Sequence, residues 1–507
     1  MKNPETILLK NALIMTLNEK DEILENTDIL IENDEIKNIS KNLNVENAHL
    51  TIDCSNKLVM PGLVNAHFHS HENLFKGTYD NLPLELWMLY TYPFKDYGPF
   101  SNRLLYLQTM LGSIEMLKSG VTSVQEDFDE KPVSTIEGQS AVIQAHVDIG
   151  FRTNFVMTES TSHLCDMIPY LREIMPIEIQ NLLPGTKSSD EAYKINEELI
   201  QTWNGRDDVK IVVSPGAPQR CDVAHLQRMF KLAEKYDLPY HFHCCETRVQ
   251  RITGKEFYQS TIPQFAEKCG ILGPRTTIAH NIWLDEKDIE VFAKNKINTV
   301  HNPISNLKLG SGVMPLIKLR EAGINVCLGT DGINSNDTYN MLEVLKMTAL
   351  LHKVTQPDYR KWPTSDEVLL MATRNAARSL MREDEIGSLE IGKKADLLIL
   401  NLHTVAFGPI TTPETVKNHI VYCENGNSIE KVIIRGRLVL DDYKIMNIDE
   451  KAILDELRGM MDEFFEKFKK TVAASDRFFP YFDEMYWKCI NNPDPMWRFT
   501  ASKNEYL

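Results

Sequence analysis

Two histidines placed two residues apart are the first feature of the sequence that could perform chemistry. His67 and His69 stand at the end of the apolar run PGLVNAHFH, residues 61–69. The run reads as a strand, and side chains at positions i and i+2 of a strand point to the same side. Both imidazoles can therefore face one metal ion, although an isolated pair of this kind is more often two unrelated histidines at a strand edge.

Further candidate ligands stand at the ends of later strand-like runs. YHFHCCE, residues 240–246, carries His243 and, three residues on, Glu246, while TIAHN carries His280 and NVCLGTDG carries Asp331. Several imidazoles and one carboxylate suit a borderline metal such as zinc or iron(II). Their order and position at strand ends make a chance arrangement improbable, so the sequence predicts a metal centre.

The middle of the chain, about residues 59–385, alternates strand-like runs with helical patterns such as DVAHLQRMFKLAEKYD. This alternation alone would also fit a doubly wound sheet, but the histidines at strand ends favour an α/β fold of the (β/α)₈ type. In such a barrel the C-terminal ends of the strands form the active-site face. The eight candidate strands are LVNAHFH, VTSVQED, FRTNFVMT, VKIVVSP, LPYHFHC, TTIAH, INTVHNP and INVCLGTD.

Both ends of the chain differ from this middle region. Residues 1–58 and 386–446 contain short alternating strands with turns, and we expect them to pair into one small β-sandwich. Residues 447–507 form a C-terminal extension that begins with a helical pattern and continues with an aromatic-rich tail. Such a tail must be buried, either on its own barrel or at an interface between subunits.

Bulk composition excludes several function classes. The net charge of −16 and the absence of a lysine- or arginine-rich block argue against nucleic-acid binding. No run reaches the roughly 18 apolar residues that span a bilayer, and the N-terminus does not resemble a signal peptide. Nine scattered cysteines without a paired pattern indicate a reducing compartment. We therefore expect a soluble cytoplasmic protein with no membrane partner.

Taken together, five motifs resemble the amidohydrolase superfamily. They are PGLVNAHFH, HFHCCET, AHN, HNPISNLKLGSGVMP and LGTDG, in this order. The most similar branch contains guanine deaminase, the S-adenosylhomocysteine and methylthioadenosine deaminases, and the triazine hydrolases. The likeness extends from residue 7 to about residue 440 and includes the segment GSLEIGKKADLLIL.

The resemblance implies a site with one divalent metal, with Zn²⁺ favoured and Fe²⁺ as the alternative. Binuclear relatives carry a lysine at the end of the fourth strand, but VKIVVSP ends without one, which favours a single metal. His280 would stand beside the metal-bound water, and Glu246 matches a glutamate that these deaminases use to move protons. The implied metal ligands are His67, His69, His243 and Asp331.

These residues predict an aminohydrolase that releases ammonia from an amino-substituted N-heterocycle or a cyclic amidine or guanidine. A divalent metal lowers the pKa of a bound water to about 7. Asp331 would accept its proton, His280 would orient the nucleophile, and Glu246 would protonate a ring nitrogen. Glu246 favours ammonia as the leaving group, but an alkylamine, chloride or ring amide stays open. A non-catalytic barrel is the remote alternative, because every implied ligand is present. By analogy with relatives, we expect a homodimer or larger homo-oligomer.

Substrate contacts are the least defined part of the prediction. For His71 and Glu72 a position in a solvated loop is an equally good interpretation, and for Trp87 simple packing is. Adenosine-type deaminases usually carry a histidine in place of Gly216, so the VSPGAPQRCD stretch departs from that group. The candidates for the pocket are His71, Glu72, Trp87, Gln219, Arg220, His301 and Asn306, with His301 also a candidate to support the site from behind.

Overall fold

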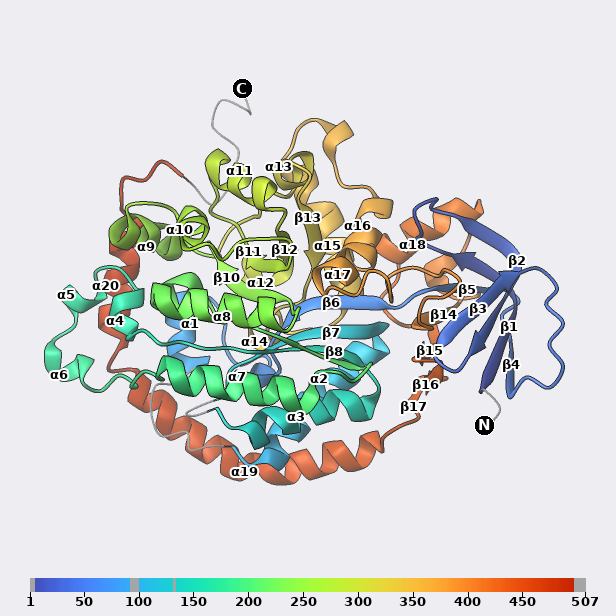
Figure 1. Ribbon diagram of the computed structural model, residues 1–507, viewed down its shortest axis with the longest axis horizontal. Helices are drawn as coiled ribbons and strands as arrows, with labels where there is room; N and C mark the ends of the chain where they lie inside the picture. The colour runs from blue at the N-terminus through green and yellow to red at the C-terminus, as the bar shows by residue number, and fades with distance from the viewer. Residues whose placement is uncertain (1–4, 92–99, 131–133, 497–507) are drawn as a thin grey trace.

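Eight parallel strands form the centre of the molecule (Figure 1). The computed structural model describes residues 5–91, 100–130 and 134–496. The strands coincide with the eight runs predicted from the sequence. They lie in two four-stranded parallel sheets, with the bounds β6 (Leu63–Phe68), β7 (Val121–Phe128), β8 (Arg152–Met157), β9 (Val209–Val212), β10 (Tyr240–Cys244), β11 (Thr276–His280), β12 (Asn298–His301) and β13 (Asn325–Leu328).

Contacts between the two sheets arrange the strands around a ring. A parallel bridge between Val213 and Tyr240 joins the end of β9 to β10. On the other side, the backbone N–H of Asp331 donates to the carbonyl of His67 at 3.0 Å, which joins the end of β13 to β6. The strands therefore follow the order of the predicted (β/α)₈ barrel, and their C-terminal ends meet on one side.

Helices between the strands cover the barrel, and their sequences explain where they begin. In α8, for example, the Asp222 side chain accepts from the backbone N–H of His225, while Leu226, Met229 and Leu232 face the core. The longer helices are α2 (Asn102–Lys118), α3 (Ile136–Ile149), α7 (Ser189–Trp203), α8 (Val223–Lys235), α9 (Arg248–Tyr258), α10 (Ile262–Cys269), α11 (Glu286–Asn295) and α15 (Met341–Val354). Shorter ones are α12 (Pro303–Lys308), α13 (Leu316–Glu321), α14 (Ile333–Asn336), α16 (Ser365–Met371), α17 (Arg374–Ser379) and α18 (Val416–Tyr422).

Strands from both chain ends lie in one nine-stranded sheet, on the right in Figure 1. Its link between the two ends is the antiparallel pairing of β5 with β14. The buried ion pair between Arg152 and Asp396 ties this sheet to the start of β8. The exact division of the chain into domains stays a prediction. The strands are β1 (Thr6–Met15), β2 (Ile23–Glu32), β3 (Glu35–Ser40), β4 (Leu50–Asp53), β5 (Lys57–Pro61), β14 (Leu397–Asn401), β15 (Ile429–Ile434), β16 (Arg437–Asp441) and β17 (Lys444–Ile445).

The C-terminal extension packs on the barrel of its own chain. Helix α19 (Glu450–Ser475) runs along α2, with Phe464 and Phe468 buried, and α20 (Phe479–Ile490) follows it. Phe482 is buried, but Trp487 stays about half exposed, and Trp497 of the predicted aromatic tail lies outside the described residues. Within the described residues, no helix is long and apolar enough to cross a membrane.

Candidate metal centre and active site

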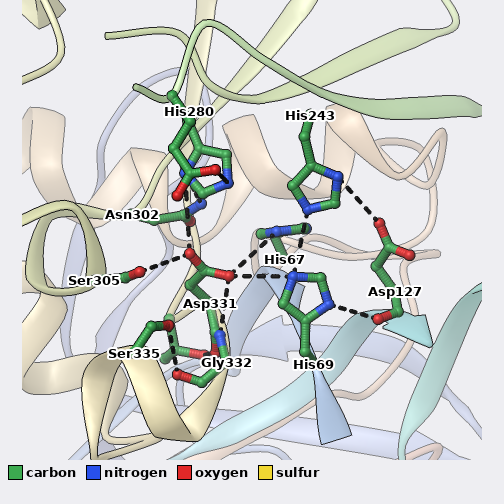
Figure 2. A network of polar contacts seen from close by, with 12 residues as sticks. His67, His69, Asp127, His243, His280, Asn302, Ser305, Asp331, Gly332 and Ser335 are labelled. Atoms are coloured by element: carbon green, nitrogen blue, oxygen red, sulfur yellow. Dashed lines mark hydrogen bonds and ion pairs between the residues drawn. The ribbon is translucent and has the colours of Figure 1, made fainter. Parts of the chain in front are cut away.

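Four imidazoles and one carboxylate converge at the C-terminal end of the barrel strands (Figure 2). The Asp331 Oδ1 atom lies 3.5 Å from the Nε2 of His67 and 3.2 Å from the Nε2 of His69. The Nε2 atoms of His243 and His69 are 3.3 Å apart. Together with His280, these residues form what we call the metal cluster, and the structure brings all five predicted residues together.

Backbone carbonyl groups fix the ring orientation of two of these histidines. The Nδ1 of His69 lies 2.6 Å from the carbonyl oxygen of Asp127, and the Nδ1 of His243 lies 2.9 Å from that of Gly216. A carbonyl oxygen only accepts, so each Nδ1 carries a proton and each Nε2 is turned toward the cluster. The Nε2 of His67 is buried and has no hydrogen-bond partner among the residues that the structure describes. This donor set fits a divalent metal with tetrahedral preferences.

Asp331 is held by its neighbours in a backbone conformation that few non-glycine residues adopt, with φ at 63°. The Ser305 hydroxyl donates to its Oδ2 at 2.7 Å, and the Gly332 N–H donates to its Oδ1 at 2.9 Å. Burial raises the pKa of this carboxyl, but His280, His67 and His69 outweigh burial and hold the pKa well below its usual range. Asp331 is therefore an ionised carboxylate, as a metal ligand must be.

Glu246 and His280 face one another beside the cluster. The Nδ1 of His280 lies 3.0 Å from the amide oxygen of Asn306, so the proton is on Nδ1. The other nitrogen, Nε2, lies 3.7 Å from the Oε2 of Glu246. Burial raises the pKa of Glu246. A buried carboxyl with a raised pKa next to a ring nitrogen is suited to receiving and returning a proton.

Two of the residues predicted to contact substrate lie behind the cluster instead. Asn306 is buried and accepts from His280, so it positions the ring rather than lining the pocket. His301 is fully buried, and its Nε2 lies 3.1 Å from the Nε2 of His352. His301 ends β12 and Asn306 lies in α12 just after it, but both side chains turn into the core, where they meet polar partners. The prediction that they face substrate is therefore corrected.

A cavity of about 300 Å³ opens directly onto the metal cluster. The other five predicted substrate contacts line it: His71, Glu72, Trp87, Gln219 and Arg220. Apolar side chains from three segments far apart in sequence complete its sides. They come from α1 (Leu84–Thr91), from the loop between β8 and α7 with its short helices α4 (Leu164–Met167), α5 (Leu171–Ile174) and α6 (Ile177–Gln180), and from α9.

Several polar residues of the cavity were missed in the sequence. Glu85 precedes Trp87 by two residues, and burial raises its pKa to about 7. Glu159 also lines the cavity, and its Oε2 lies 3.0 Å from the Nε2 of His225. Ser335 follows Asp331 by four residues and lines the cavity as well. In the sequence, a carboxylate two residues before Trp87 carries no pattern that distinguishes it from a solvated residue, so the sequence offers no signal for Glu85.

Comparison with known proteins agrees with this site. The pattern of the amidohydrolase family matches residues 58–439, which include the whole metal cluster. The chain belongs to the amidohydrolase family. This family member is 31% identical over 464 residues to a 5′-deoxyadenosine deaminase of Methanosarcina acetivorans, covering 90% of this chain and 98% of that protein. It is 32% identical to a 5-methylthioadenosine/S-adenosylhomocysteine deaminase of Caldanaerobacter subterraneus subsp. tengcongensis, covering 89% and 96%.

Solved structures share the fold of this amidohydrolase. An adenosine deaminase from Xanthomonas campestris with bound zinc superimposes with a TM-score of 0.80 at 25% identity, covering 91% of this chain and 98% of that chain. An atrazine chlorohydrolase from Arthrobacter aurescens in complex with zinc gives a TM-score of 0.81 at 24% identity, covering 90% and 99%. The second likeness shows the fold alone, because enzymes with this fold act on different leaving groups.

Proposed function

We propose that this protein is a metal-dependent aminohydrolase. It hydrolyses a C–N bond of an amino-substituted N-heterocycle, or of a cyclic amidine or guanidine, and releases ammonia. The observation that carries the proposal is the pair formed by Glu246 and His280, which flank a His/Asp cluster at the bottom of a cavity. The deaminases that are 31% and 32% identical to this chain support the same reaction class.

The metal ligands in this proposal are His67, His69, His243 and Asp331. When bound, a divalent metal lowers the pKa of a water molecule and so provides a nucleophile at neutral pH. Zinc is the proposed metal and iron(II) the alternative, since the imidazole and carboxylate donors suit both. The bound zinc in the related adenosine deaminase structure supports the first choice.

The protein's own groups handle the protons. Asp331, ionised and oriented by Ser305, takes the proton of the attacking water. His280, oriented by Asn306, directs its Nε2 toward the developing oxygen charge. Glu246 gives a proton to the ring nitrogen beside the attacked carbon and recovers one from the new hydroxyl group. The proton that Asp331 took from the water passes to the amino group, which leaves as ammonia. His71, Glu72, Trp87, Gln219 and Arg220 are the proposed substrate contacts.

The test is ammonia release by zinc- or iron-loaded protein from a panel of amino-heterocycles. The panel contains guanine, 8-oxoguanine, pterins, aminotriazines, creatinine, cytosine and adenosine derivatives. Glu246→Gln keeps the shape of the side chain but cannot carry the proton, so we expect kcat to fall about 10²- to 10⁴-fold with the metal content unchanged. Glu290→Gln, at an exposed position of α11, is the matched control.

Each outcome of this experiment bears on the proposal. Ammonia from one compound, lost in Glu246→Gln and kept in Glu290→Gln, supports the aminohydrolase and identifies its substrate. Product formation without ammonia would instead favour an alkylamine, chloride or ring amide as the site of cleavage. If metal-loaded protein converts none of these compounds, the aminohydrolase proposal is wrong for this substrate range.

Assembly and location are also part of the proposal. We propose a homodimer or larger homo-oligomer, supported by Trp487 on α20, whose surface is 52% exposed. A cytoplasmic location is supported by nine cysteines, none of which is paired in a disulfide. Light scattering on the purified protein measures the assembly, and a Trp487→Ala variant tests whether this ring takes part in it.

A further inference from the structure

Arg220 is a cation of the cavity that has no partner of its own. Its guanidinium makes no hydrogen bond or ion pair with any residue that the structure describes. The residue before it, Gln219, is buried, and its amide oxygen likewise has no hydrogen-bond partner among the described residues. Both side chains line the cavity above the metal cluster. A buried polar group is normally paired, so the amide oxygen of Gln219, with the partly buried Arg220 beside it, is available to a ligand.

The backbone beside Arg220 explains how its side chain gains this position. Gly216 has φ at 69°, and a Cβ atom there would lie 2.5 Å from the carbonyl oxygen of Glu159, so no other residue fits. The same imagined Cβ would lie 3.6 Å from the Cδ of Arg220. The methylene groups of Arg220 therefore pass beside residue 216, where no side chain occupies the space. The positive charge of the guanidinium acts on Glu246 and Asp127.

Among the described residues, the acidic groups of the cavity form no ion pair with this cation. Glu159 lies 3.0 Å from His225 and accepts from Asn196, while Glu72 accepts the backbone N–H of Asn334 at 3.2 Å. No carboxylate oxygen of the described residues lies within ion-pair distance of Arg220. The guanidinium therefore offers its N–H groups to whatever enters the cavity, and it binds oxygen acceptors in a planar, two-point geometry.

We propose that Arg220 and Gln219 form a subsite for an oxygen acceptor of the substrate, a ring carbonyl or a carboxylate. This rests on the proposed aminohydrolase function and narrows its substrate class to amino-heterocycles that carry such an oxygen. Arg220 donates to the oxygen, and the Gln219 amide oxygen accepts from a neighbouring ring N–H. A site built around buried polar groups rejects an analogue that leaves them unpaired.

Matched substrates test this subsite within a single enzyme preparation. Ammonia release is measured for guanine against 2-aminopurine, for cytosine against 4-aminopyrimidine, and for isocytosine against 2-aminopyrimidine. A fourth arm, 2-aminopyrimidine-5-carboxylate, distinguishes a carboxylate from a ring carbonyl. We expect kcat/KM to be about 10- to 100-fold higher for the compound with the oxygen, which corresponds to one hydrogen bond to a charged group. Arg220→Met should remove this preference, and Arg220→Lys should keep only part of it.

Arg360→Met, at an exposed position distant from the cavity, is the control and should keep the full preference. Ammonia release without any preference for the oxygen would leave the aminohydrolase standing and overturn this inference, as would an Arg220→Met variant that keeps the preference. If no compound releases ammonia, calorimetric titration of the protein with the oxygen-bearing compounds still tests whether the subsite exists. Binding that weakens in Arg220→Met supports the subsite, and absence of binding to the wild-type protein overturns it.

Discussion

The metal cluster and the pocket wall are built in different ways. Each residue of the metal cluster lies in a barrel strand or within three residues of its end, and backbone carbonyls or buried side chains orient the rings. The pocket wall, by which we mean α1, the loop 158–188 and α9, comes from separate segments held together by an apolar cluster of its own with α20. In Figure 1 these segments gather on the left, opposite the nine-stranded sheet.

This difference separates the chemistry of the protein from its choice of substrate. The barrel core is continuous around the metal cluster, so the ligands cannot move without disturbing the strands. The pocket wall has a smaller core that includes Leu86, Leu171, Val249 and Phe482. It can therefore vary in sequence or position while the cluster stays intact. Changes to the cluster should abolish turnover, and changes to the wall should alter stability and selectivity.

The largest effect is expected from Asp331→Asn, which changes the metal cluster itself. The amide keeps the shape but loses the negative charge that faces His67 and His69 and that would bind the proposed metal. We expect the metal content to fall and kcat/KM to drop about 10³-fold or more. Metal analysis and ammonia release measure both, with Asp384→Asn at an exposed position as the control. Full metal content together with full activity would contradict the ligand assignment.

The next largest effect is expected where the cluster and the pocket wall meet. Gly216→Ala forces a Cβ into the carbonyl of Glu159 at a positive φ, and the Gly216 carbonyl accepts from His243. We expect a loss of about 3 kcal/mol in the free energy of unfolding. Urea denaturation measures this loss. Gly185→Ala, in open space on the loop 158–188, should leave stability nearly unchanged. Equal stability of the two variants would show that the backbone at residue 216 relaxes freely.

A pH-dependent effect of similar or smaller size is expected from Glu85 in the pocket wall. Burial, with Glu246 adding to it, raises the pKa of Glu85 from 4.5 to about 7, while the Thr247 hydroxyl donates to it. Between pH 4.5 and 7 the folded protein thus binds more protons at this site than the unfolded chain. Its contribution to stability falls as the pH rises through that window, by about 3 kcal/mol at most.

Glu85→Gln removes this titration, because the amide stays neutral. Glu246, together with Cys489 on α20, faces Glu85 and is unchanged in the variant. Relative to wild type, the variant should therefore gain stability as the pH is raised from 5.5 to 8, which thermal unfolding of both proteins across that range measures. A difference between the two proteins that does not change with pH would rule out this titration.

The smallest effect is expected from Arg248→Met, which loosens the link between α9 and the C-terminal extension. Arg248 donates to the carbonyls of Cys489 at 3.1 Å, Asn492 at 2.6 Å and Asp494 at 3.0 Å, and to that of Met496. We expect a loss of about 1–2 kcal/mol and faster proteolysis of the extension, with the metal content unchanged. Arg458→Met on α19, which is mostly exposed, is the control. Unchanged proteolysis would show that the apolar contacts of Phe482 suffice.

The sequence by itself determined the barrel strands and the metal cluster. Strands carry a period of two that is visible locally, and in a barrel their C-terminal ends must meet, so His67, His69, His243 and Asp331 could be placed without knowing any distance. The predicted pairing of the chain ends rested on pattern alone, and in the structure β5 and β14 join strands of both ends in one hydrogen-bonded sheet.

Only the tertiary structure decided which residues line the pocket. His301 and Asn306 looked like substrate contacts because they stand at or just after the end of a barrel strand, yet both turn into the core and meet His352 and His280. Glu85 looked like an ordinary loop residue, yet packing of α1 against Thr247 buries it. The direction of a side chain beyond a strand end depends on its contacts with segments that are distant in the sequence. Such contacts produce no local periodic pattern, so the sequence alone does not reveal them.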